Sequence, residues 1–203
     1  YLYPSETNRQ KTNRTMYIAR AKRKENIAEY ILYLWQLEDL LRALQMSPEA
    51  IYSQLAEPLP ADAAGRQEAF LWYMELVNLL REEGKEQHGH LDHTLHLIAD
   101  LQNLHLQLMK LPAGEHYRTL FARLAPELPR LRQALGKPEV SDIELCFRAL
   151  YAVMLYRIKD KDAPANEQTA VRDVLELISP VIAELAKVYG QSERGEIDLF
   201  REA

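Results

Sequence analysis

Hydrophobic residues recur every three or four positions along most of the chain, the spacing that places them on one face of an α-helix. The clearest stripe runs from Asn26 to Gln45, and similar stripes cover residues 62–83, 91–111, 115–135, 142–159 and 166–189. The sequence has no alternating Val, Ile and Thr runs and no Asn-Gly or Asp-Gly hairpin turns. This pattern predicts an all-α protein, folded as a single-domain bundle of about six helices.

Serine, proline and glycine mark the predicted helix ends. Ser47-Pro48-Glu49 and Ser141-x-x-Glu144 are typical helix starts, because a serine oxygen can accept a hydrogen bond from a free backbone N–H. Two prolines should interrupt the segment 115–135, and Pro180 predicts a kink in the segment 166–189. We expect five glycines to lie between helices: Gly84, Gly89, Gly114, Gly136 and Gly190.

The segment 142–159 differs from the others because apolar residues cover nearly all of its directions. Between Leu145 and Ile158 only Arg148 and Arg157 are charged. A helix that is hydrophobic all round is normally buried. We therefore predict that this helix lies at the centre of the bundle.

Composition sets the domain organisation and excludes several classes of protein. The 203 residues are 47% hydrophobic and 27% charged, which is typical of a folded domain. We assign 16–190 to one helical domain, 1–15 to a disordered or artefactual extension, and 191–203 to a polar tail. The apolar runs are too short for a transmembrane helix, and a net charge of -5 gives no general attraction to nucleic acid or anionic lipid. The single cysteine, Cys146, suits a reducing compartment, so we expect a cytoplasmic protein.

Histidine is concentrated near the middle of the chain, where five of the six fall between residues 88 and 105. The string His88-x-His90-x-Asp92-His93 resembles the metal-binding signature of the metallo-β-lactamase superfamily. In that superfamily the string follows a β-strand, whereas here a predicted helix ends near Gly84 and another helix follows. The context therefore argues against that superfamily.

A smaller metal site carried by a helix is the alternative for these residues. Its weak candidate ligands are His88, His90, Asp92, His93 and His96. On a helical wheel His96, Asp100, Asn103 and Gln107 share one polar sector with His93, and this sector could equally be a solvated face, which we favour. We interpret His105, on the apolar side, as a core histidine bonded to a neighbour. The sequence thus predicts no catalytic or cofactor-binding residue.

Three other features carry candidate chemistry. The basic stretch from Arg20 to Lys24 could bind phosphates or an acidic partner, although it lacks a nucleic-acid recognition motif and a solvated stretch is favoured. Glu38 could be a buried acid or base, or it could pair with Arg42 one turn away. Cys146 is interpreted as a core residue and not as a nucleophile.

The helix 26–45 carries Leu32 and Trp35 outside its main apolar stripe, which suggests neighbours on more than one side. We therefore favour a non-enzymatic helical interaction or scaffold protein that self-associates through this helix. A metal-binding enzyme or sensor using His88–His96, and a protein that binds an anionic partner through Arg20–Lys24, are the alternatives.

From Met16 onward the chain resembles an uncharacterised family of small all-helical bacterial proteins, known only as a domain of unknown function. The resemblance is clearest in the run from Ala19 to Arg42, and it continues through Glu82-Glu-Gly-Lys, Gly89-His-Leu, Asp100-Leu-Gln-Asn-Leu-His105 and Val140-Ser-Asp-Ile-Glu-Leu-Cys-Phe. It implies a helical bundle in a bacterial cytoplasm. It implies no activity and no catalytic residues.

Overall fold

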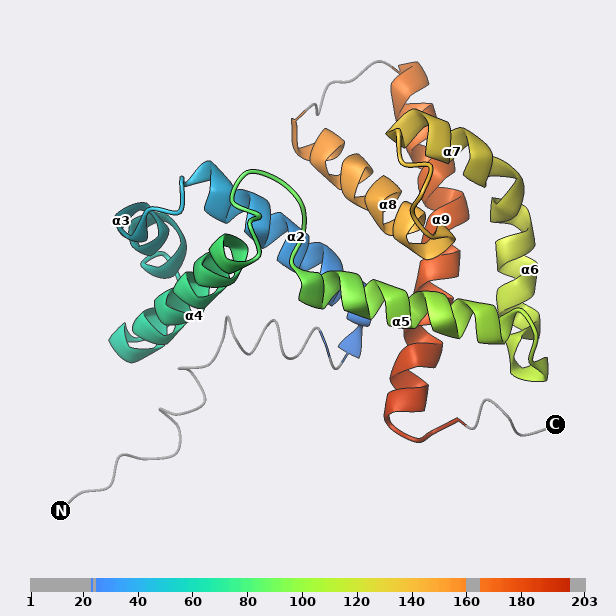
Figure 1. Cartoon of the computed structure of the whole chain (residues 1–203), viewed down its shortest axis with the longest axis horizontal. Helices are drawn as coiled ribbons and strands as arrows, with labels where there is room; N and C mark the ends of the chain where they lie inside the picture. Colours follow the sequence, from blue (N-terminus) through green and yellow to red (C-terminus); the bar gives the residue numbers. More distant parts are fainter. Residues whose placement is uncertain (1–22, 24, 160–164, 198–203) are drawn as a thin grey trace. The chain divides into compact units, whose positions relative to one another are not determined.

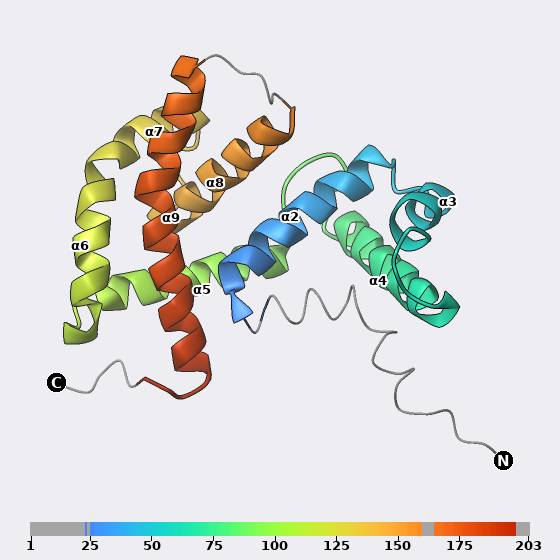
Figure 2. The same ribbon diagram turned by 180° about the vertical axis from the view of Figure 1, so that it is seen from behind.

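Helices joined by short loops make up the computed structural model, which describes residues 23, 25–159 and 165–197 (Figures 1 and 2). The α-helices are α2 (Ile27–Ala43), α3 (Pro48–Ile51), α4 (Ala63–Glu82), α5 (Asp92–Leu108), α6 (Glu115–Leu124), α7 (Leu128–Leu135), α8 (Asp142–Lys159) and α9 (Ala165–Glu193). Short helical turns at Tyr52–Ala56, Pro112–Gly114 and Ala125–Glu127 connect some of them. The described ranges contain no strand, so the all-α prediction is confirmed.

The chain divides into two compact units. Of the described residues, unit 1 contains 23, 25 and 29–95, and unit 2 contains 26–28, 96–159 and 165–197. Our assignment of 16–190 to one folding domain stays a prediction, because compactness does not measure cooperative unfolding.

The predicted helix starts are present as hydrogen-bonded caps. Ser47 Oγ accepts from the Ala50 N–H at 3.3 Å, and Ser141 Oγ accepts from the Glu144 N–H at 3.2 Å. Asp62 caps α4 in the same way, accepting from the Gly65 N–H at 2.8 Å. Each cap satisfies a backbone donor that the helix itself leaves free.

Unit 1 has its own hydrophobic core, built by the second half of α2, by α3 and the turn after it, and by α4. Its buried members are Leu37, Leu41, Met46, Ile51, Ala56, Ala69, Tyr73, Leu76, Val77, Leu80 and Leu91. Each fully buried leucine or isoleucine side chain contributes about 1.5–3 kcal/mol. This core positions the end of α4 and the loop that follows it.

Helix α8 is deeply buried in unit 2, as the sequence predicted. Ile143, Leu145, Cys146 and Phe147 are fully buried, and Ala152 alone is exposed among the described side chains of the helix. Helix α8 packs against α7 and α9, and α6 packs against α9 (Figure 2). The apolar character all round α8 therefore matches contacts on several sides.

Proline and glycine end the helices of unit 2 as predicted, with one exception. The segment 115–135 is divided by the turn Ala125–Glu127, and Gly136 closes α7 with φ of 60°, a left-handed cap. The prediction for Gly190 is wrong, because this glycine lies inside α9, which continues to Glu193. The Gly190 carbonyl accepts from the Arg194 N–H at 3.2 Å, so the helix continues through it and past residue 191, where we expected the tail to begin.

Gly114 is required by a close approach between two backbone segments. A Cβ atom placed on it would lie 1.8 Å from the carbonyl oxygen of Leu108. The Arg118 guanidinium donates to the same Leu108 carbonyl at 2.8 Å and to that of Leu111 at 2.6 Å. The start of α6 is thus held against the end of α5 at a distance that only glycine permits.

The expectation that Trp35 faces another molecule is wrong. Its side chain is fully buried in this chain, where the indole N–H donates to Thr94 Oγ1 at 3.0 Å. Leu32 is half-buried. The periodicity of α2 indicated a second contact side correctly, but this side is covered by the chain itself.

Two further sequence features concern the N-terminus and the membrane. Residues 1–15 and most of the basic stretch Arg20–Lys24 lie outside the described residues, and Arg23 is exposed. In the described ranges no helix is long and apolar enough to cross a membrane.

Candidate functional site

Unit 1 contains a buried carboxylate. Glu38, on α2, is 1% exposed, and its Oε2 lies 2.8 Å from His90 Nδ1. Its Oε1 accepts from the Leu91 N–H at 3.2 Å, and Arg42 Nη2 lies 3.9 Å from Oε2. Burying a carboxylate without partners costs several kcal/mol, so the two hydrogen bonds and the nearby guanidinium charge explain why the chain tolerates it.

The His90 ring is held on its flat side as well as at its edge. It stacks on Trp35, with ring centroids 3.8 Å apart and an interplanar angle of 8°. Thr94 Oγ1, which accepts from the Trp35 indole, donates to the Leu91 carbonyl at 2.8 Å. Glu38, Trp35 and Thr94 therefore fix the end of the loop that precedes α5.

Arg42 fixes the rest of the α4–α5 loop, residues 83–91. Its Nε donates to the Lys85 carbonyl at 3.1 Å, and its Nη2 donates to the Gly89 carbonyl. Its Nη1 donates to Asp39 at 2.8 Å, so all of the guanidinium nitrogens have partners. The loop is thereby tied to α2 through one side chain that makes several hydrogen bonds at once.

Acidic residues and a lysine complete the start of α5. Glu83 Oε2 accepts from the Asp92 N–H at 2.8 Å and from Lys85 Nζ at 2.8 Å, and Lys85 also donates to Asp92. Partial burial acts to lower the pKa of Lys85, but its hydrogen bonds to Asp92 and Glu83 outweigh this and raise it. The acids at this helix start also interact favourably with the helix dipole.

Three buried ionisable side chains of unit 2, those of His105, Tyr117 and Cys146, are neutral at pH 7. His105 Nδ1 lies 2.8 Å from the Tyr117 hydroxyl, and both side chains are buried. Burial lowers the pKa of His105 and raises that of Tyr117. Burial also raises the pKa of Cys146 to about 12, so it is a thiol and not the thiolate that a nucleophile requires. These findings agree with the interpretation of His105 and Cys146 as core residues.

Comparison with protein families places most of this chain in one of them. A family model described as "Domain of unknown function (DUF4924)" matches residues 16–196. The chain belongs to this family. Neither the comparison with curated proteins nor that with solved structures gives a significant match.

The DUF4924 match covers both units and includes the whole cluster around Glu38. The description of the family assigns no activity.

The histidines predicted as metal ligands do not converge. His90 bonds Glu38, and His93 Nε2 lies 3.0 Å from the Tyr30 hydroxyl. Asp92 pairs with Lys85, while His88 and His96 are exposed. Within the described part of the chain, no three His, Cys, Asp or Glu side chains are placed to hold a metal ion.

Sequence reasoning identified Glu38 and its pairing with Arg42, but it missed the partner that binds most closely. The spacing of Glu38 and Arg42, one helical turn, was a usable signal. His90 is 52 positions away from Glu38 and belongs to a loop without periodicity, so no local pattern connects the two.

Proposed function

We propose that this chain is a non-enzymatic helical interaction protein, and that it binds its partner through the outer face of α4 in unit 1. The observation that carries the proposal is the exposure of two large apolar side chains there. Leu71 is 54% exposed and Leu79 is 42% exposed. They are eight positions apart, so at about 100° per residue they point within roughly 80° of one another.

The same face carries acidic side chains. Glu75 and Glu82 are exposed, and both fall in the sector between or beside the two leucines. A partner that fits this face would present apolar and basic groups together, as a basic amphipathic helix does. A second copy of the chain would present the same acids, and Trp35, which first suggested self-association, is buried. A different protein is therefore the better partner.

The chemistry of the buried groups supports a non-enzymatic role. Glu38 is engaged by His90, by a backbone N–H and by Arg42, and Cys146 is held as a thiol. Catalytic acids, bases and nucleophiles need pKa values matched to their task and access to a substrate. The Glu38 cluster instead anchors the loop that carries His90.

The test uses a synthetic Leu/Lys amphipathic peptide, labelled for fluorescence anisotropy, and the full-length protein. The wild type should bind it saturably, and the variant Leu71→Ser/Leu79→Ser should bind it at least about tenfold more weakly, since each truncated contact costs about 1 kcal/mol. A matched control is Leu106→Ser/Met109→Ser, two exposed apolar residues of unit 2. Absent binding by the wild type, or equal loss in both variants, would refute the proposal.

Light scattering on the same proteins gives the second arm of the test. The wild type is expected to be monomeric in the absence of the peptide. A dimer that Leu71→Ser/Leu79→Ser dissociates would identify a second copy as the partner and would overturn our assignment of a basic partner.

We further propose a bacterial cytoplasmic setting for the protein. The buried Cys146 thiol supports a reducing compartment, and the sequence resemblance to a family of bacterial proteins supports the bacterial setting. Immunodetection after cell fractionation tests this, and recovery in a membrane or extracellular fraction would contradict it.

A further inference from the structure

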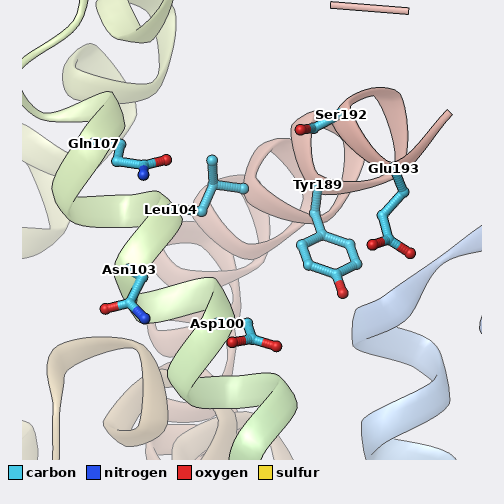
Figure 3. Close-up of a pocket in the computed structure, with 7 residues that line it drawn as sticks. All are labelled: Asp100, Asn103, Leu104, Gln107, Tyr189, Ser192 and Glu193. Atoms are coloured by element: carbon cyan, nitrogen blue, oxygen red, sulfur yellow. The ribbon is translucent and has the colours of Figure 1, made fainter. Parts of the chain in front are cut away.

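A small polar cavity opens between α5 and α9 in unit 2. Its volume is about 250 Å³. Figure 3 shows that the polar side chains lining it come from both helices: Asp100, Asn103 and Gln107 from α5, and Tyr189, Ser192 and Glu193 from α9. The buried side chain of Leu104 adds an apolar surface between them.

The cavity explains a pattern that the sequence left open. Asp100, Asn103 and Gln107 follow one another at spacings of three and four, which places them in one polar sector of α5. If this polar sector were only a face open to solvent, no other helix would lie opposite it. Here Tyr189 and Glu193 of α9, themselves four positions apart, provide that wall.

The charges that line the cavity indicate which kind of ligand it would bind. Both ionisable carboxylates, those of Asp100 and Glu193, lack an ion pair or hydrogen bond with any residue that the structure describes. No lysine or arginine lines the cavity. Arg194, the neighbouring cation in the chain, is paired with Glu196, its Nη2 donating to Oε2 at 2.9 Å.

We propose that this cavity binds a small organic cation, an ammonium or guanidinium group on a short apolar stem. The two carboxylates would attract the charge, the face of Tyr189 would offer a cation–π contact, and Leu104 would contact the stem. At about 30 Å³ per water the volume equals roughly eight waters, which suits a ligand of about six to eight heavy atoms. This inference does not depend on the function proposed for α4.

The test is a titration of the full-length protein, followed by NMR chemical shifts. The probes are 1,4-diaminobutane and n-butylguanidinium, and butyrate is the anionic control. Both cations should bind saturably, with shifts confined to residues of α5 and α9 around the cavity, and butyrate should not. Higher salt should weaken the binding, because the lining residues are open to solvent.

Two variants connect the binding to the cavity. Asp100→Asn/Glu193→Gln keeps the shape of both side chains and removes their charge, so the affinity for both cations should fall about 5- to 20-fold. Glu86→Gln/Glu139→Gln removes two exposed carboxylates that do not line the cavity, and it should bind as the wild type does. Circular dichroism should show equal helix content in all three proteins.

A further comparison of two probes shows whether the cation belongs to a protein side chain or to a free small molecule. Tighter binding of lysine capped at both ends would indicate a basic side chain of a protein, and tighter binding of 1,4-diaminobutane would indicate a free amine. The proposal is overturned if neither cation binds saturably, if butyrate binds equally well, or if Asp100→Asn/Glu193→Gln leaves the affinity unchanged.

Discussion

Removal of the Glu38 charge tests directly whether the buried cluster of unit 1 stabilises the fold. The carboxylate accepts from His90 at 2.8 Å and from the Leu91 N–H at 3.2 Å, and it lies 3.9 Å from Arg42. Glu38→Gln keeps the side chain's shape and one oxygen, but it loses the charge. Glu38→Ala removes every acceptor and leaves the buried Leu91 N–H without a partner.

The size of the effect follows from the number of bonds that each variant loses. A hydrogen bond to a charged group contributes about 1.5–3 kcal/mol, so Glu38→Gln should reduce the free energy of unfolding by roughly 2 kcal/mol. Removing one side of a buried ion pair costs about 3–5 kcal/mol, and this range is expected for Glu38→Ala. Such losses are a large fraction of the roughly 5–15 kcal/mol that stabilises a typical domain.

Urea denaturation followed by tryptophan fluorescence measures these values. Both tryptophans of the chain, Trp35 and Trp72, belong to unit 1, so the signal reports the unit that holds Glu38. Glu86→Gln, an exposed acid of the same loop, is the control and should stay within about 0.5 kcal/mol of the wild type. A Glu38→Gln variant as stable as that control would refute the structural role.

Three further predictions concern pH, backbone packing and metal. Burial holds the pKa of His105 below its ordinary value of 6.5, so the unfolded chain binds the proton more readily than the folded chain does. The stability of unit 2 should therefore fall as the pH drops from about 7 to about 5. In thermal unfolding followed by circular dichroism, His105→Gln should make the stability depend less on pH. Gly114→Ala places a Cβ atom against a carbonyl oxygen, so it should lower the free energy of unfolding by more than about 3 kcal/mol. Gly136→Ala has open space around its Cβ atom and should cost only about 1–2 kcal/mol, because its backbone is left-handed. Equal urea midpoints for the two variants would contradict this prediction. Elemental analysis of untagged protein should find no stoichiometric metal, and His93→Ala/His96→Ala should not change that result; a stoichiometric ion lost in that variant would restore the metal hypothesis.

The helices could be predicted from the sequence because their signals are local. Ser47 and Ser141 cap the helices that follow them, and the low charge of 142–159 matches the burial of α8. The prediction that the last helix ends before Gly190 is wrong, because a glycine inside a helix costs only about 1 kcal/mol. The contacts made by the neighbouring residues of α9 outweigh this cost.

The cluster around Glu38 could be predicted only in part. Its contact with Arg42 follows from helical spacing, but the stacking of Trp35 on His90 joins residues 55 positions apart and depends on how unit 1 packs. The same limit applies to the α5–α9 cavity. A helical wheel predicts that Asp100 belongs to a polar face of α5. That Tyr189 of α9 lies opposite this face can be seen only in the tertiary structure.

Hydrogen exchange with and without the Leu/Lys peptide tests most directly whether this protein acts through a surface and not through its histidines. We predict slower exchange over residues 63–82 of α4 when the peptide is bound, and unchanged exchange over 83–93. Protection confined to 83–93, where three of the histidines lie, would contradict this prediction and would indicate that the peptide binds at that loop.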